Sequence, residues 1–258
     1  MIRKLEINKI ESTDSIKKPI LLVFLTILVF FLSQIIAVVI LVIFKQIFGN
    51  HEGSSQINNW ITSSIYAQFF YVLIAETINL LFVFLYFKKF KIKFSSIGIR
   101  SVKLSDLFYA LIIFPIYYGS YFLVVLFVTF FYKGLNVNQV QQIGFNHVSG
   151  ILEITLSFIA LVVLPPITEE ILVRGVIYSS LKQKISPLLS VLLTSALFAS
   201  AHLPEGGKSG LLWIGAIDTF VLSVFLIFLR EKTNGLISSM ILHALKNGVA
   251  FYYLFLLH

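Results

Sequence analysis

Residues 151–181 have the sequence ILEITLSFIALVVLPPITEEILVRGVIYSSL, an apolar run that carries two adjacent glutamates and an arginine in its second half. A transmembrane helix needs about 20 predominantly apolar residues, and this run is longer. Ionisable side chains are costly inside a bilayer, so those that are retained there usually belong to a functional site. The run therefore predicts a membrane-spanning helix with a functional site built into it.

The rest of the chain has the composition of an integral membrane protein. Of its 258 residues, 58% are hydrophobic and 12% are charged, and the mean hydropathy is +0.93. Soluble domains are about half apolar and about a quarter charged. The absence of cysteine excludes disulfides, thiolate metal sites and a cysteine nucleophile. We predict an all-α polytopic membrane bundle of about seven transmembrane helices, since each needs about 20 residues.

Apolar runs along the sequence give the expected spans. The first run is too long for a secretory signal, whose apolar stretch has about 7–15 residues, so we expect it to be retained. The expected spans are Ile20–Phe44, Ile65–Phe87, Leu107–Tyr132, Ile151–Leu181, Pro187–His202, Gly210–Leu229 and Leu236–Leu257.

The basic residues predict the orientation of these spans. Cytoplasmic loops carry an excess of Lys and Arg. Fifteen basic residues lie in the N-terminal segment, the 88–103 loop and the turns at 182–184 and 230–232, against three in the other connections. We therefore expect the N-terminus inside, with the polar stretches 49–59 and 134–149 as external loops. An alternative places the 182–186 hairpin partly in the cytosol, which would reverse the later spans.

Three regions follow from this reading. Residues 1–18 form a cytoplasmic N-terminal segment, residues 19–149 form a three-span region, and residues 150–258 form a four-span region that holds the candidate site. No internal repeat is visible in the sequence.

The acidic pair in the fourth span follows Pro165-Pro166, which we expect to interrupt the helix because proline lacks a backbone donor. Thr168 would then cap the helix that resumes. Glu170 and Arg174 are four residues apart on one face, which favours an ion pair. Glu169 is displaced by about 100° around the helix and is not offered the same partner. The spacing predicts a structural Glu170–Arg174 pair and a free, reactive Glu169.

Two histidines and an asparagine are expected at the same depth as Glu169. A turn near residues 185–186 puts Glu169 and His202 each about sixteen residues away along antiparallel helices. His243 and Asn247 share one face of the last span at four-residue spacing. A buried carboxylate beside an imidazole is a plausible pair for activating water. The second imidazole and the amide can donate to a developing oxyanion.

These residues form three ordered motifs, Glu169-Glu170-x-x-x-Arg174, Phe198-x-x-x-His202 and His243-x-x-x-Asn247. Together they resemble the motifs of the CPBP family, also called the Abi family, which includes the type II CAAX prenyl endopeptidases. The resemblance covers roughly residues 150–250. It implies an intramembrane protease in which Glu169 and His202 activate water, His243 and Asn247 form the oxyanion site, and Glu170, Arg174 and Phe198 support the site.

This resemblance does not fix the cofactor or the substrate. The family has been described both as metalloproteases and as glutamate-dependent enzymes. We favour no required metal, although zinc would be held by Glu169, His202 and His243 if present. The expected substrate is a peptide or membrane protein in the lipid bilayer, not nucleic acid. A composition rich in Ile, Phe, Lys and Asn is typical of an AT-rich bacterial genome and favours a bacterial cytoplasmic membrane. In that setting the resemblance implies maturation of a bacteriocin or pheromone peptide, or self-immunity.

Two other functions stay open at this point. The first is a non-catalytic immunity or regulatory partner with the same fold. The second is a transporter in which Glu76 and Asp218 carry protons, although that class usually shows two repeated halves. We expect Glu76 and Asp218 to be structural or to line a cavity. Lys246 is placed on a different face from His243 and receives no catalytic role.

Overall fold

The computed structural model describes residues 16–49, 53–145 and 148–257, and every regular element in these ranges is helical. The predicted N-terminal segment, residues 1–18, lies mostly outside the described residues. The elements are α1 (Pro19–Phe48), α2 (Ser54–Ser63), α3 (Ile65–Phe90), η1 (Phe94–Ile97), α4 (Leu104–Phe131), α5 (Gly150–Phe158), η2 (Ile159–Val163), α6 (Leu164–Glu169), η3 (Glu170–Tyr178), α7 (Ser179–Lys182), α8 (Pro187–His202), η4 (Leu203–Ser209), α9 (Trp213–Thr233) and α10 (Ile237–Phe255).

The predicted polytopic helical membrane bundle is confirmed. In the described ranges, six helical segments are long and apolar enough to cross a membrane: Pro19–Phe48, Ile65–Phe90, Leu104–Phe131, Gly150–Lys182, Pro187–Gly207 and Trp213–Thr233. The seventh expected span corresponds to α10, which is not among the six. Its apolar character is lowered by His243, Lys246 and Asn247, the polar residues that the candidate site requires.

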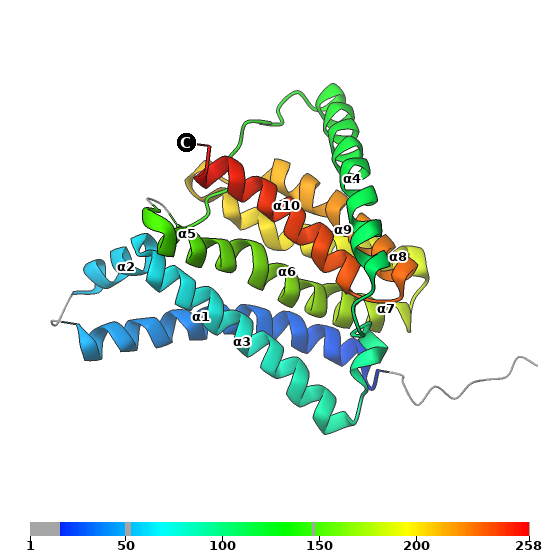
Figure 1. Cartoon of the computed structure of the whole chain (residues 1–258), viewed down its shortest axis with the longest axis horizontal. Helices are drawn as coiled ribbons and strands as arrows, with labels where there is room; N and C mark the ends of the chain where they lie inside the picture. The colour runs from blue at the N-terminus through cyan, green and yellow to red at the C-terminus, as the bar shows by residue number, and fades with distance from the viewer. Residues whose placement is uncertain (1–15, 50–52, 146–147, 258) are drawn as a thin grey trace, which may run out of the picture.

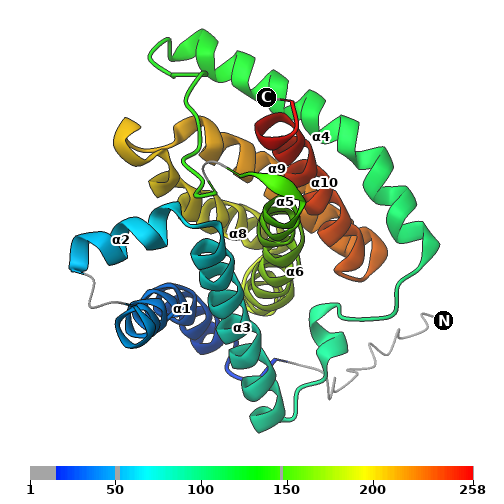
Figure 2. The ribbon, with the colours of Figure 1, turned by 60° about the vertical axis from the view of Figure 1, so that its left-hand side comes forward.

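One long helical segment, from α5 to α7, runs through the middle of the bundle (Figures 1 and 2). Helices α1 and α3 pack against it on one side, and α8, α9 and α10 pack against it on the other. Helix α4 lies outside this arrangement, against α9 and α10, as Figure 2 shows. The central segment therefore contacts both halves of the bundle, and it carries the acidic pair.

The expected interruption at Pro165-Pro166 is wrong, because the helix continues through the two prolines with wider π turns on both sides. These turns are η2 and η3, and the amide of Leu164 bonds to the carbonyl of Ile159, five residues earlier. Two successive residues without an N–H prevent regular α-helical bonding, and membrane helices accept this where neighbours satisfy the freed carbonyls. Thr168 is consequently inside the helix and is not a cap.

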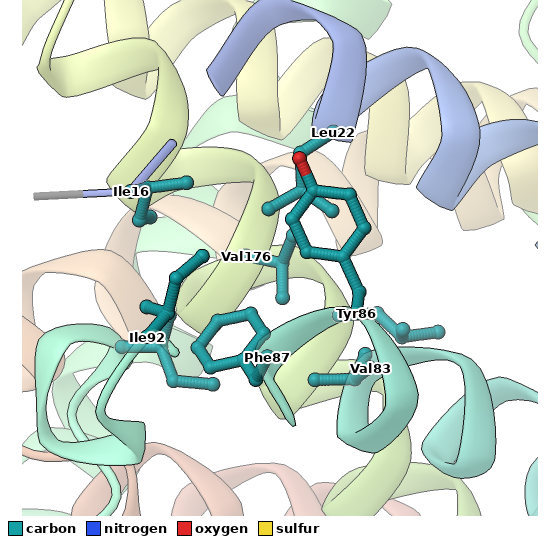
Figure 3. Close-up of a cluster of buried hydrophobic side chains, with 9 residues drawn as sticks. Ile16, Leu22, Val83, Tyr86, Phe87, Ile92 and Val176 are labelled. Carbon is teal, nitrogen blue, oxygen red and sulfur yellow. The ribbon is translucent and has the colours of Figure 1, made fainter. Parts of the chain in front are cut away.

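A cluster of buried side chains fixes one end of the central segment to α1 and α3 (Figure 3). Its members are Ile16, Leu22, Val83, Tyr86, Phe87, Ile92, Ile97, Leu172 and Val176. Because they come from α1, α3, η1 and η3 and from the residues beside them, burial of this cluster holds the acidic segment in register with the N-terminal helices.

The basic connections meet at one end of the molecule. Arg100 donates to both carboxylate oxygens of Asp106, at 2.9 and 2.6 Å, and to the carbonyl of Thr233 at 3.0 Å. The hydrogen bond from Arg100 to Asp106 raises the pKa of the guanidinium. Lys182 pairs with Glu231. The 88–103 loop and the turns at 182–184 and 230–232 thus share one end of the bundle, as the charge count predicts. That this end is cytoplasmic stays a prediction.

The connection between the first two spans differs from expectation. Residues 49–59 were expected to be a loop, but Ser54–Ser63 forms helix α2. Ile57 and Ile61 are four residues apart in a mostly polar sequence and therefore lie on one face of α2, and Ile57 is buried. Within the described residues, the 134–149 stretch contains turns, a bend and irregular backbone, so it is a loop as predicted.

Candidate active site

Glu170 and Arg174 form a fully buried ion pair in η3. Arg174 Nη1 donates to Glu170 Oε1 at 2.8 Å, and both side chains are 0% exposed. The same carboxylate oxygen lies 3.0 Å from His243 Nδ1. The predicted pair is therefore present, and it also fixes the orientation of an imidazole from α10.

Glu169 points toward the other side of His243. Its Oε2 lies 3.7 Å from His243 Nε2, and its side chain is 20% exposed. This separation is longer than a direct hydrogen bond and suits a bridging water. Glu170 is sealed and charge-paired, whereas Glu169 reaches an open space. The structure thus separates the two adjacent carboxylates in the way their helical positions predict.

His202 is held with one ring nitrogen free. Its Nδ1 donates to the carbonyl of Phe198, at 2.8 Å, because a carbonyl can only accept. In the neutral imidazole, Nε2 then keeps its lone pair and can accept a proton or bind water. The tautomer follows from this hydrogen bond.

Phe198 packs at the centre of these groups. Its ring centroid lies 4.3 Å from the Arg174 guanidinium carbon, 4.7 Å from the His202 ring and 5.9 Å from the His243 ring. Helix α8 contributes both Phe198 and His202, so the first two motifs meet through a cation–π contact. Phe198 thus lies against Arg174 and both histidines, and its supporting role stays a prediction.

Asn247 has a partner that explains its position. Its Nδ2 donates to the carbonyl of Leu161 at 3.0 Å. The residues four and five positions after Leu161 are Pro165 and Pro166, so neither an α turn nor a π turn can supply an N–H to this carbonyl. The amide of α10 therefore satisfies the backbone group that the two prolines leave unpaired. Its second N–H is left for other use.

The candidate residues line a cavity of about 620 Å³. One part of its wall is polar and the other is apolar. The polar lining includes Glu169, His202, Glu205, His243, Lys246 and Asn247, and the apolar lining includes Val38, Ile61, Val72, Leu161, Ala250 and Leu254. A cavity of this size holds a ligand or a short peptide segment. All four residues predicted to be catalytic, Glu169, His202, His243 and Asn247, are thus brought to one space.

Lys246 lines the same cavity, so its placement on a different face from His243 was wrong. Residues three apart on a helix are neighbours on its surface, and this spacing could have indicated it. Lys246 Nζ lies 3.3 Å from Asp218 Oδ2, and the hydroxyl of Tyr117 donates to the other Asp218 oxygen. Asp218 therefore holds a cavity lysine. Glu76 is buried and is not among the residues that line the cavity, and its Oε2 lacks a hydrogen-bond partner within the described ranges.

The segment between α4 and α5 covers part of the cavity. The backbone of Gln142 donates to the carbonyl of Glu205 at 2.7 Å, and the side chain of Gln141 donates to the Glu205 carboxylate at 2.7 Å. At the other end, the backbone of Phe145 donates to Gln68 of α3. Sequence reasoning treated this stretch only as an external loop, and its composition gives no signal for these contacts.

A metal site in this cavity would have to be built from its carboxylate and imidazole side chains. In the part of the chain that the structure describes, no three His, Cys, Asp or Glu side chains are arranged to hold one ion. Glu169, His202 and His243, the set named for zinc, surround the cavity without forming such a group. We therefore derive no step through a metal.

Comparison with known proteins identifies a matching family model. Residues 151–249 match the family model described as type II CAAX prenyl endopeptidase Rce1-like. No curated protein and no solved structure matches the chain. The matched residues run from the start of α5 into α10. They include all three motifs, and with them Glu169, His202, His243 and Asn247. This match supports a CAAX protease family assignment for residues 151–249.

Proposed function

We propose that this chain is an intramembrane endopeptidase that hydrolyses a peptide bond of a membrane-associated peptide or protein with water activated by Glu169 and His202. The family match and the apolar helices support a CAAX-type protease of the membrane. The observation that carries the proposed mechanism is the convergence of Glu169, His202 and His243, from three helices, on one cavity.

Glu169 is assigned as the general base. Its side chain reaches the cavity, whereas the Glu170 carboxylate is buried and shared by Arg174 and His243. The free Nε2 of His202 binds the attacking water. The water oxygen bonds to the scissile carbonyl carbon, and Glu169 takes the released proton. When the carbon–nitrogen bond breaks, that proton passes to the leaving amine.

His243 and Asn247 are assigned to the oxyanion. With Nδ1 donating to Glu170, His243 offers Nε2 as a donor when it carries both protons. Asn247 offers the amide hydrogen that does not bond to Leu161. Fixed donors that face developing charge in a site shielded from water are worth several kcal/mol, about 10²–10³-fold in rate for one donor.

The cellular role is also a proposal. A small bacterial membrane enzyme of this kind fits the maturation of a bacteriocin or pheromone peptide, or self-immunity, at the cytoplasmic membrane. The apolar part of the cavity suits an apolar peptide segment, because its lining includes Val38, Ile61 and Leu254. We propose that no metal is required.

Peptide ends compared between membranes from three strains test this function. The strains express wild type, Glu169→Gln or Glu153→Gln at equal levels. Glu153 is a matched control because its carboxylate bonds to Ser149 at the start of α5, away from the cavity lining. New ends that appear with wild type and Glu153→Gln, but not with Glu169→Gln, support the proposal. Identical ends in all three strains, with the cellular phenotype intact, support a non-catalytic partner.

A further inference from the structure

A second, smaller pocket lies between α1, η3 and α8 and has a volume of about 160 Å³. It shares Glu169 and His202 with the main cavity. Its other lining residues are Thr26, Ile27, Phe30 and Phe31 from α1, Leu172, Val173 and Ile177 from η3, and Leu197, Phe198, Ser200 and Ala201 from α8. The pocket therefore adjoins the two groups assigned to water activation, and the rest of its lining differs from that of the main cavity.

The walls of this pocket offer almost no hydrogen bonds to an occupant. The Thr26 hydroxyl donates to the carbonyl of Leu22 at 2.8 Å, and the Ser200 hydroxyl donates to the carbonyl of Leu197 at 2.8 Å. Both hydroxyls are thus engaged within their own helices. What remains is aliphatic and aromatic surface, with Glu169 and His202 at one end. An apolar group is favoured here because it loses no hydrogen bonds with water.

The volume limits what can enter. An apolar cavity of about 150 Å³ is known to accept benzene. A pocket of 160 Å³ therefore has room for one leucine, isoleucine, methionine or phenylalanine side chain. Its outer rim includes Phe31 and Leu197, both exposed on the surface of the bundle. These exposed members of the lining are both apolar.

We propose that this pocket is a side-chain subsite that binds one large apolar residue next to the scissile bond. The inference rests on the proposed function, because it uses Glu169 and His202 as the groups beside the reacting carbonyl. The side chain of a residue that flanks this carbonyl begins two or three bonds from the carbonyl carbon, so the side chain must enter a space next to the water-activating pair. The pocket is such a space.

Variants in α1 test the subsite without touching the motif residues. Ile27→Trp fills the pocket, and Leu28→Trp is its control because Leu28 is exposed and does not line the pocket. Phe30→Ala widens the pocket, and Phe24→Ala is its control for the same reasons. Apolar pockets discriminate by about 10–200-fold for one methylene. We expect wild type to favour leucine over alanine at one flanking position at least about tenfold.

The assay uses purified protein in phosphatidylcholine vesicles with a synthetic library of apolar peptides, and mass spectrometry of the new ends. We expect Ile27→Trp to reverse the preference toward alanine and glycine, Phe30→Ala to admit tryptophan, and both controls to match wild type. An unchanged flanking preference in Ile27→Trp, with cleavage retained, overturns the subsite. So does a dependence of cleavage on acyl-chain length alone, because the occupant would then be lipid. If wild type cleaves no more than Glu169→Gln, the proposed function itself fails.

Discussion

The buried Glu170–Arg174 pair makes a quantitative prediction about stability. Arg174→Met removes the guanidinium that lies 2.8 Å from Glu170 and leaves a carboxylate with 0% exposure facing only His243 Nδ1. Removing one partner of a buried ion pair costs about 3–5 kcal/mol, since the remaining charge is uncompensated. Loss of the cation–π contact with Phe198, at 4.3 Å, adds up to about 2 kcal/mol. We expect Arg174→Met to lower the free energy of unfolding by about 3–7 kcal/mol.

A double substitution separates charge from packing. In Glu170→Leu combined with Arg174→Met, neither charge stays in the interior, and apolar replacements of buried pairs are often nearly neutral. We therefore expect the double variant to be more stable than Arg174→Met alone. Glu170 Oε2 and Arg174 Nη2 lack hydrogen-bond partners in the described residues, so the pair is not fully satisfied. This favours a small net loss when both charges are removed.

Reversible unfolding in mixed detergent micelles, followed by circular dichroism, measures these free energies. Lys182→Met is the control, because Lys182 and Glu231 form an exposed pair with side chains 39% and 36% exposed. Exposed pairs contribute about 0–1 kcal/mol. The reasoning is refuted if Arg174→Met and Lys182→Met cost the same. It is also refuted if the double variant loses the full sum of its two single substitutions.

Three further predictions concern the cavity. Asn247→Leu leaves the Leu161 carbonyl without a donor and should lower the unfolding free energy by about 1–3 kcal/mol in the same assay; an unchanged value would show that the carbonyl has another partner. Gln68→Ala removes the acceptor for the Phe145 amide. The natural chain has no cysteine, so a single cysteine placed at position 141 can report on this segment, and it should react faster with a maleimide in Gln68→Ala than with Gln68 intact. An equal rate would contradict the contact. Peptide cleavage in vesicles should persist in a strong chelator, whereas loss of cleavage that zinc restores would establish a metalloenzyme.

Much of the site could be predicted because helical periodicity relates sequence spacing directly to position on a face. Glu170 and Arg174 at four-residue spacing form the expected pair, and Glu169, one position earlier, faces the cavity. The same rule applied to Lys246 would have placed it beside His243. The placement of Lys246 on another face neglected its three-residue spacing from His243.

Other features depend on contacts between distant segments, which periodicity does not encode. The continuous helix through Pro165-Pro166 is stabilised by an amide from α10, 86 residues away in sequence. The covering of the cavity by residues 141–145 depends on Glu205 and Gln68. Each requires the packed structure, because the partner is chosen by geometry and not by residue type.

The most direct test of the central claim is cleavage by purified protein in vesicles made in water enriched in heavy oxygen. The test compares wild type with Glu169→Gln, a substitution that keeps the shape of the side chain and removes its capacity to accept a proton. The account predicts one heavy oxygen in each new carboxyl terminus with wild type, and no new termini with Glu169→Gln. Undiminished cleavage by Glu169→Gln would contradict the assignment of Glu169 as the base.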